Sequence, residues 1–266
     1  MPISLPHTEV ADALRDLNQR IALPRFRHLQ AGEVEEKSPG ELVTIVDREL
    51  EAALSPILAS LIPGSRVVGE EAAAANPDVL ADIDHGWVWL VDPLDGTSNF
   101  AGGNEDFASM VALLRDGITV ASWLYAPLHQ QLAQAELGAG AWLDSQRWQL
   151  PEQASARPLN GTIKTRFLPD AYKVELATRP DLDRFGTHQG AAGIEYPQLA
   201  RGVWDFILYW RTLPWDHAPG SLFVNESGGR VANLAGEPYL AASKQPGLLA
   251  VADAAHWQEI RALLPG

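Results

Sequence analysis

The stretch WVWLVDPLDGTSNF, residues 87–100, changes abruptly from an apolar run to a polar turn. Its first five residues are apolar, which is the pattern of a short strand covered on both faces. Asp92 and Asp95 follow, and Pro93 between them stiffens the chain because its ring fixes φ. Two structures fit this pattern: an ordinary Asp-Gly turn after a strand, or a stiff turn that presents two carboxylates to a ligand.

The residues that complete this turn add oxygen and N–H groups. The carbonyl of Leu94 can join the two carboxylates as a third oxygen, and hard cations such as Mg²⁺ prefer oxygen ligands. Gly96 permits a sharp change of direction, and Thr97 and Ser98 are common N-caps for a helix that we expect to begin near Asn99. Free N–H groups at a helix start attract anions. A metal site beside an anion site is what a phosphate ester needs.

Composition limits the class of protein. A chain of 266 residues can form one large domain or two packed halves with a sizeable core. No apolar run approaches the ~18 residues that span a bilayer, and the first residues lack a secretory pattern, so we expect no membrane contact and a cytoplasmic location. The chain has no cysteine, which excludes disulfides, thiolate nucleophiles and cysteine-ligated zinc.

The charge balance bears on partners. The formal net charge of −14 repels phosphate backbones at long range, which argues against nucleic acid as a partner. Only four lysines are present, the arginines are scattered, and the seven histidines show no paired spacing. We recognise no Ser-His-Asp arrangement, so any catalytic chemistry rests on the carboxylates.

Hydrophobic periodicity outlines the elements. It predicts a helix over residues 8–30, a second helix from near Thr44 to Leu61 with a kink or break at Pro56, and a largely antiparallel strand cluster over 87–143. Alternating layers of helices and sheets follow from this order. We expect one unit with an N-terminal half of about 1–145 and a C-terminal half of about 155–266, and further helices over 170–178, 215–227 and 254–264.

Three other acidic residues lie where we expect a strand to end or a helix to begin. Glu70, in GEE, follows an expected strand, and Asp216, in PWDHAPGSLFVNESGG, opens an expected helix. Asp47 lies near a helix start after Thr44, and Lys37 precedes both. Each position alone is more typical of helix capping than of a ligand site.

Taken together, these motifs are specific. The order GEE, WLVDPLDGTSNF and WDHAPGSLFVNESGG, with LVTIVD after a lysine, resembles the inositol monophosphatase family of Mg²⁺-dependent, lithium-sensitive phosphatases. The resemblance runs from about Lys37 to Val231. It implies an α/β fold, the layered αβαβα sandwich shared with fructose-1,6-bisphosphatase, and a homodimer.

The resemblance also implies roles for individual residues. Glu70, Asp92 and the Leu94 carbonyl would hold a first Mg²⁺ ion. Asp92, Asp95 and Asp216 would hold a second ion, and a third, weaker ion would share Glu70. Thr97, hydrogen-bonded to Asp47, would position the attacking water together with Glu70, with Lys37 nearby, and the amides of Gly96 and Thr97 would bind the phosphate.

The chain departs from the family where substrate is recognised. The family's arginine-containing segment corresponds here to THQGAAGIE, residues 187–195, in which Gly190, Ala191 and Ala192 keep the small residues but the arginine is absent. Tyr209 stands where inositol phosphatases carry a glutamate, seven residues before the last metal aspartate. The expected substrate is inositol 1-phosphate or a similar polyol phosphate. Histidinol phosphate, a 3′-phosphonucleotide and a sugar bisphosphate stay open, as does a non-enzymatic regulatory protein on this fold.

Overall fold

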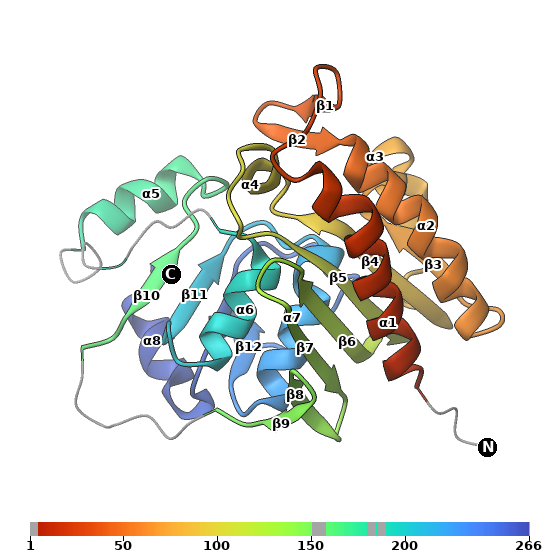
Figure 1. The fold of residues 1–266 in the computed structure, drawn as a ribbon. Coiled ribbons are helices and arrows are strands. Elements are labelled where there is room, and N and C mark those ends of the chain that lie inside the picture. The colour runs from red at the N-terminus through yellow and green to blue at the C-terminus, as the bar shows by residue number, and fades with distance from the viewer. Residues whose placement is uncertain (1–4, 151–157, 180–184, 186–189, 266) are drawn as a thin grey trace.

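Two sheets and three layers of helices alternate through the molecule (Figure 1). The computed structural model describes residues 5–150, 158–179, 185 and 190–265. Within them, separate apolar cores fill the spaces between successive layers. The predicted α/β class and the layered αβαβα sandwich are confirmed.

The larger sheet has seven strands in simple sequence order. Only β3 and β4 run parallel, and every other neighbouring pair is antiparallel, as predicted for 87–143. A tight turn joins β5 to β6, in which Asp116 and Gly117 adopt the positive φ values of 49° and 78° that tight hairpin turns require. The strands are β3 (Arg66–Gly69), β4 (Trp87–Asp95), β5 (Ala108–Arg115), β6 (Ile118–Ala126), β7 (Gln131–Glu136), β8 (Gly140–Leu143) and β9 (Gln146–Trp148).

The smaller sheet has the order β10-β11-β13-β12, and again only its first pair, β10 and β11, is parallel. Strands β10 and β11 of this sheet were not predicted, because they are too short to show an alternation of apolar and polar residues. A separate antiparallel hairpin pairs β1 with β2. The remaining strands are β10 (Gly161–Ile163), β11 (Phe206–Tyr209), β12 (Arg230–Asn233), β13 (Leu248–Val251), β1 (Val34–Ser38) and β2 (Glu41–Thr44).

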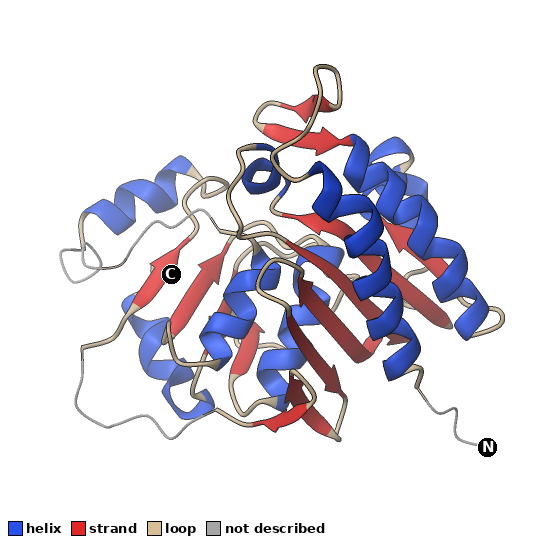
Figure 2. Cartoon of the chain, viewed as in Figure 1, coloured by secondary structure: helices blue, strands red, loops and turns tan. Residues whose placement is uncertain are grey.

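Two helices cover the outer face of the larger sheet (Figure 2). These are α1 (His7–Leu17) and α2 (Ile45–Leu61), which pack on the buried side chains of Trp89 and Trp123. The predicted helix over 8–30 is too long, since α1 passes into a π-helical turn over 18–22. The predicted break at Pro56 is wrong: α2 runs on without interruption, because the buried leucines before and after the proline both pack on the core.

A middle layer, α6 (Ala192–Ala200) and α7 (Pro214–Glu226), lies between the sheets. The sequence did not predict α6, because nearly all of its residues are buried and it therefore lacks an amphipathic period. The outer layer on the smaller sheet is α5 (Asp170–Ala177) and α8 (Trp257–Leu263), near the predicted positions. Two short helices, α3 (Glu70–Ala75) and α4 (Thr97–Ala101), follow β3 and β4.

The division into halves stays a prediction, because residues 151–157 lie between the two sheets in sequence and outside the described part. In the part of the chain that the structure describes, no helix combines the length and apolar character needed to cross a bilayer.

Candidate active site

A pocket of about 420 Å³ opens where the two sheets meet. Both sheets direct the carboxyl ends of their single parallel strand pair toward it, which is the usual place for ligands in α/β folds. Lys37, Asp47 and Ala191 are not among the residues that line it. The predicted site residues that do line it are Glu70, Asp92, Leu94, Asp95, Gly96, Thr97, Gly190, Ala192, Tyr209 and Asp216.

A buried polar network holds the turn that ends β4. The Oδ1 atom of Asp92 accepts a hydrogen bond from the N–H of Leu94 at 3.1 Å. The carbonyl of Pro93 accepts one from Ser109 Oγ at 2.6 Å, and Ser109 in turn accepts one from Asn18 Nδ2 at 2.9 Å. Asn18 lies in the π-helical turn after α1, a kind of irregularity often found near functional sites. Neither Asn18 nor Ser109 was predicted, since each contacts the turn only through tertiary structure.

Gly96 makes the sharp redirection that the sequence predicted. Its φ is +84°, and a Cβ there would lie 2.9 Å from the Cβ of Ala191 and 3.0 Å from the carbonyl oxygen of Asp106. Ala191 therefore packs behind the turn. The predicted N-cap role of Thr97 and Ser98 is wrong: Gly96 is the N-cap of α4, which has no side-chain cap.

The Thr97 hydroxyl instead faces two acceptors, Asp47 Oδ1 at 2.9 Å and the Leu94 carbonyl at 3.0 Å. It has one hydrogen to donate, so it can serve only one of them at a time. Asp47 is fully buried in a capping box, where its Oδ2 accepts from the N–H and the hydroxyl of Thr44 at 2.8 and 2.6 Å. Burial raises the pKa of Asp47 to about 6, although the hydroxyl groups oppose this shift. Asp47 can thus accept the hydrogen bond that the Thr97 hydroxyl donates.

Glu70 is held at the start of α3 by residues from two other elements. The carboxylate of Glu51, on α2, accepts the N–H groups of Glu71 and Ala72 at 2.8 and 2.9 Å and so fixes this helix start. Lys37, from β1, donates to Glu70 at 3.0 Å and also pairs with Glu71. Burial by itself lowers the pKa of Lys37, but the two carboxylates raise it on balance. Lys37 is therefore a permanent ammonium beside Glu70.

Five carboxylates line the pocket. One is Glu41, and we call the other four, Glu70, Asp92, Asp95 and Asp216, the acidic wall. Burial, and then the charge of Glu70, raises the pKa of Asp92 and of Asp216 well above the usual range. Burial also raises the pKa of Asp95, against the N–H of Gly193, which donates to its Oδ2 at 2.6 Å. Carboxylates that oppose one another's ionisation form a donor set suited to a hard divalent cation. The Leu94 carbonyl adds a further oxygen to the same pocket.

The smaller sheet contributes cations to the same pocket, and we call Lys164, Arg166 and Arg211 the cationic wall. Lys164 follows β10 and forms an ion pair with Glu195 of α6, which is 1% exposed. Arg211 follows β11 and pairs with Glu41 of the β1–β2 hairpin. Neither Lys164 nor Arg166 was predicted from the sequence. The signal available was an acid at the end of THQGAAGIE and one of only four lysines in the chain.

Tyr209 lines the pocket at the end of β11, but its hydroxyl is engaged. It donates to Glu195 at 3.1 Å, and burial followed by the charge of Glu195 raises the pKa of Tyr209 well above its usual value. A carboxylate therefore lies close to Tyr209, and it is that of Glu195 on α6. Thr187, at the start of the divergent segment, lies outside the described residues.

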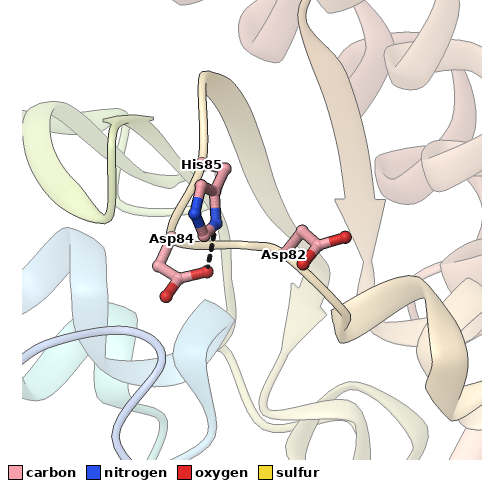
Figure 3. Close-up of side chains that lie close together, drawn as sticks. All are labelled: Asp82, Asp84 and His85. Carbon is pink, nitrogen blue, oxygen red and sulfur yellow. Dashed lines mark hydrogen bonds and ion pairs between the residues drawn. The ribbon is translucent and has the colours of Figure 1, made fainter.

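A second acidic group, Asp82, Asp84 and His85, lies on the exposed connection before β4 (Figure 3). His85 Nδ1 and Asp84 Oδ1 are 2.8 Å apart. Within the described residues this is the one place where three carboxylate or imidazole groups have ligand atoms within 4.8 Å of one another. No three carboxylates of the acidic wall come that close, so a cation there would have to draw them together against their repulsion.

Comparisons with known proteins agree with this arrangement. The model of the inositol monophosphatase family matches residues 7–264. The inositol-1-monophosphatase of Bacillus subtilis is 29% identical over 210 residues, 77% of this chain and 78% of that protein. The Nus factor SuhB of Escherichia coli is 29% identical over 215 residues, 77% of each chain.

Solved structures share the fold over its full length. The extragenic suppressor protein suhB from Bartonella henselae superposes with a TM-score of 0.83 at 25% identity, covering 99% of this chain and 100% of that one. The match over residues 7–264 and the shared architecture show that this chain belongs to the inositol monophosphatase family.

Proposed function

We propose that this chain hydrolyses a small phosphate monoester with Mg²⁺ as its cofactor, two or three ions at a time. The observation that carries the proposal is the acidic wall: three separate regions of the fold aim four carboxylates into one pocket, where burial and the neighbouring carboxylates raise the pKa of Asp92 and of Asp216. Such a wall is electrostatically unfavourable unless a cation joins it. Inositol 1-phosphate is the reference substrate, because a relative carries that activity in its name.

The residues that would hold the ions are those of the acidic wall and the Leu94 carbonyl. When bound, Mg²⁺ would neutralise these carboxylates, polarise the phosphate and lower the pKa of a water molecule. Thr97 would hold that water in place. The Thr97 hydroxyl donates its hydrogen bond to Asp47, so the lone pairs of the hydroxyl oxygen would be directed at the water.

Two further groups would support the reaction. Lys37 would orient the carboxylate of Glu70, to which it donates a hydrogen bond at 3.0 Å. The amides of Gly96 and Thr97 would bind the phosphate, and the left-handed conformation of Gly96 would direct them to it.

Turnover on a panel of esters tests the proposal. We expect phosphate release from at least one of inositol 1-phosphate, histidinol phosphate, adenosine 3′,5′-bisphosphate and fructose 1,6-bisphosphate when Mg²⁺ is present, and none in EDTA. Full activity in EDTA would contradict the proposal. Mg²⁺ should also raise the Tm of the wild type and raise it less in Asp92→Asn, because a ligand that binds only the folded state stabilises that state.

A regulatory role is the second candidate, because a relative of equal identity is named a Nus factor. The net charge of −14 argues against direct contact with nucleic acid and leaves a protein partner. No turnover on the whole panel, with the Mg²⁺-dependent rise in Tm still present, would favour this role. The homodimer and the cytoplasmic location that we expect are separate proposals, and sedimentation equilibrium tests the first.

A further inference from the structure

The cationic wall is positioned by the topology of the smaller sheet. β10 and β11 lie side by side and run in the same direction, so their carboxyl ends reach the same edge (Figure 1). Lys164 is the residue directly after β10, and its N–H donates to the carbonyl of Leu208 at 2.9 Å, which continues the ladder. Arg211 follows β11 after one further residue. The two cations are therefore anchored on the sheet.

Two members of the cationic wall have a counter-ion within the chain. Glu195 pairs with Lys164 and also accepts a hydrogen bond from Tyr209, so Lys164 is held by a buried, fixed carboxylate. Glu41 pairs with Arg211, whose guanidinium also lies 4.1 Å from the ring centre of Phe167. Each of these cations is thus held at the pocket while its charge is balanced.

Arg166 differs from both. Among the described residues it forms no ion pair with a carboxylate. Its guanidinium lies 4.8 Å from the ring centre of Phe167 and so close to Gly40 that a Cβ there would be 3.0 Å from its Nη2. Aromatic contact and the hairpin turn direct the guanidinium, and its charge lowers the pKa of Glu41 without forming an ion pair with it. The wall therefore has three cations and two paired carboxylates, so that within the wall the cations exceed the carboxylates by one charge.

We propose that Arg166, with Lys164 and Arg211 beside it, binds a second anionic group on the substrate, a phosphate or a carboxylate carried by the leaving group. This inference rests on the proposed function, in which the scissile phosphate lies at the acidic wall. The acidic wall repels a second anion, so the cationic wall is the part of the pocket where such a group is favourable. A guanidinium can bind either oxyanion with two parallel hydrogen bonds.

Matched substrate pairs test this inference. Fructose 1,6-bisphosphate against fructose 1-phosphate adds a phosphate, and 2-phosphoglycerate against glycerol 2-phosphate adds a carboxylate. We expect the wild type to have a kcat/KM at least about tenfold higher for the member with the second anion in at least one pair, mostly through KM, because charge-assisted hydrogen bonds act on binding. The pair that shows the preference identifies which oxyanion is bound.

Two variants assign the preference to the wall. Arg166→Gln should abolish it, so that the two members of the pair have about the same kcat/KM, mainly through a higher KM for the member with the second anionic group. Arg20→Gln changes the net charge equally on an exposed helix face and should keep the preference. Lys164→Met leaves Glu195 buried without its ammonium and can prevent folding, so the double variant Lys164→Met with Glu195→Gln is the usable form, and it should weaken the preference.

Binding separates failure of this inference from failure of the proposed function. The rise in Tm that each ester causes at fixed Mg²⁺ concentration is measured for the wild type and Arg166→Gln. A larger rise in Tm with the esters that carry a second anionic group, lost in Arg166→Gln, supports the inference even if no ester is hydrolysed. Hydrolysis with equal kcat/KM within every pair, or a preference that survives Arg166→Gln, overturns the inference and leaves the phosphatase proposal standing.

Discussion

The acidic wall and the cationic wall occupy the same pocket and are built in the same way, yet their charges are balanced differently. Each depends on the single parallel strand pair of its sheet, β3–β4 for the acidic wall and β10–β11 for the cationic wall. Among the described residues, the ammonium of Lys37 contacts the acidic wall at Glu70, and the charge of Lys164 lowers the pKa of Asp95. The cationic wall carries two carboxylates of its own, Glu195 and Glu41.

This difference shows which partner each wall lacks. Burial and neighbouring carboxylates raise the pKa of Asp92, Asp95 and Asp216, so cations from solution would stabilise the acidic wall, as the proposed Mg²⁺ site requires. A cationic wall that is largely neutralised by fixed, partly buried carboxylates is rigid and specific, and its small residual charge suits one additional anionic group rather than a polyanion.

The largest effect should come from removing a charge of the acidic wall. Asp95→Asn is expected to lower kcat by about 100-fold to 1,000-fold, because one ligand oxygen loses its negative charge at the reaction centre. Phosphate release on the best substrate of the panel measures this. Asp170→Asn removes an equal charge from a side chain that is 98% exposed, and it should leave kcat unchanged. If Asp95→Asn kept the kcat of the wild type, Asp95 would have no part in the reaction.

The contact of the β4 turn with α6 should give the next effect. In Gly96→Ala the new Cβ lies 2.9 Å from the Cβ of Ala191, and the alanine must adopt a positive φ. The free energy of unfolding should therefore fall by about 2–4 kcal/mol. Gly64→Ala is the matched control, since its φ of +85° is nearly the same but no atom lies within 4 Å. Denaturant titration of both variants separates backbone strain from the clash, and equal losses would mean that the clash is relieved by movement.

A smaller effect should follow from loosening the cationic wall. Tyr209→Phe removes the hydrogen bond to buried Glu195, so we expect a loss of about 1–3 kcal/mol in the free energy of unfolding. Tyr172→Phe is the control, because the Tyr172 hydroxyl is buried without a hydrogen-bond partner among the described residues and should be nearly neutral to remove. Similar values for the two variants would show that the Tyr209 hydroxyl does not stabilise the wall.

The last effect develops only at low pH and concerns His217, which lines the pocket from α7. Burial lowers the pKa of His217 to about 4. Its ring is satisfied when neutral: Nε2 donates to the Arg211 carbonyl at 2.9 Å, and Nδ1 accepts from Tyr196 at 2.9 Å. As pH falls from about 6.5 to about 4, the unfolded chain binds a proton that the folded chain does not, so stability falls by at most about 1.4 kcal/mol per pH unit.

His217→Gln should remove this contribution. The free energy of unfolding of the wild type minus that of His217→Gln should therefore decrease as pH falls through this window and stay constant above pH 7. A difference that is independent of pH would show that His217 titrates normally in the folded protein.

Much of the fold was predictable because its signals are local. The hairpin at Asp116, the strand that ends at Asp92 and the helix opened by Asp216 each follow from a few neighbouring residues. α6 and β10 were missed, since one is buried on every side and the other is three residues long. The break expected at Pro56 did not occur, because core packing outweighs the hydrogen bond that a proline removes.

The sequence by itself determined the family, the acidic motifs and the turn at Gly96, because carboxylates, proline and glycine at fixed spacing have local consequences. Only the tertiary structure decided how Thr97 is used, what supports the Pro93 carbonyl and what balances the cations. Those contacts join residues far apart in the chain, as with Arg211 and Glu41, 170 residues apart. Their physical cause is the packing of elements that are distant in sequence, which no local pattern encodes.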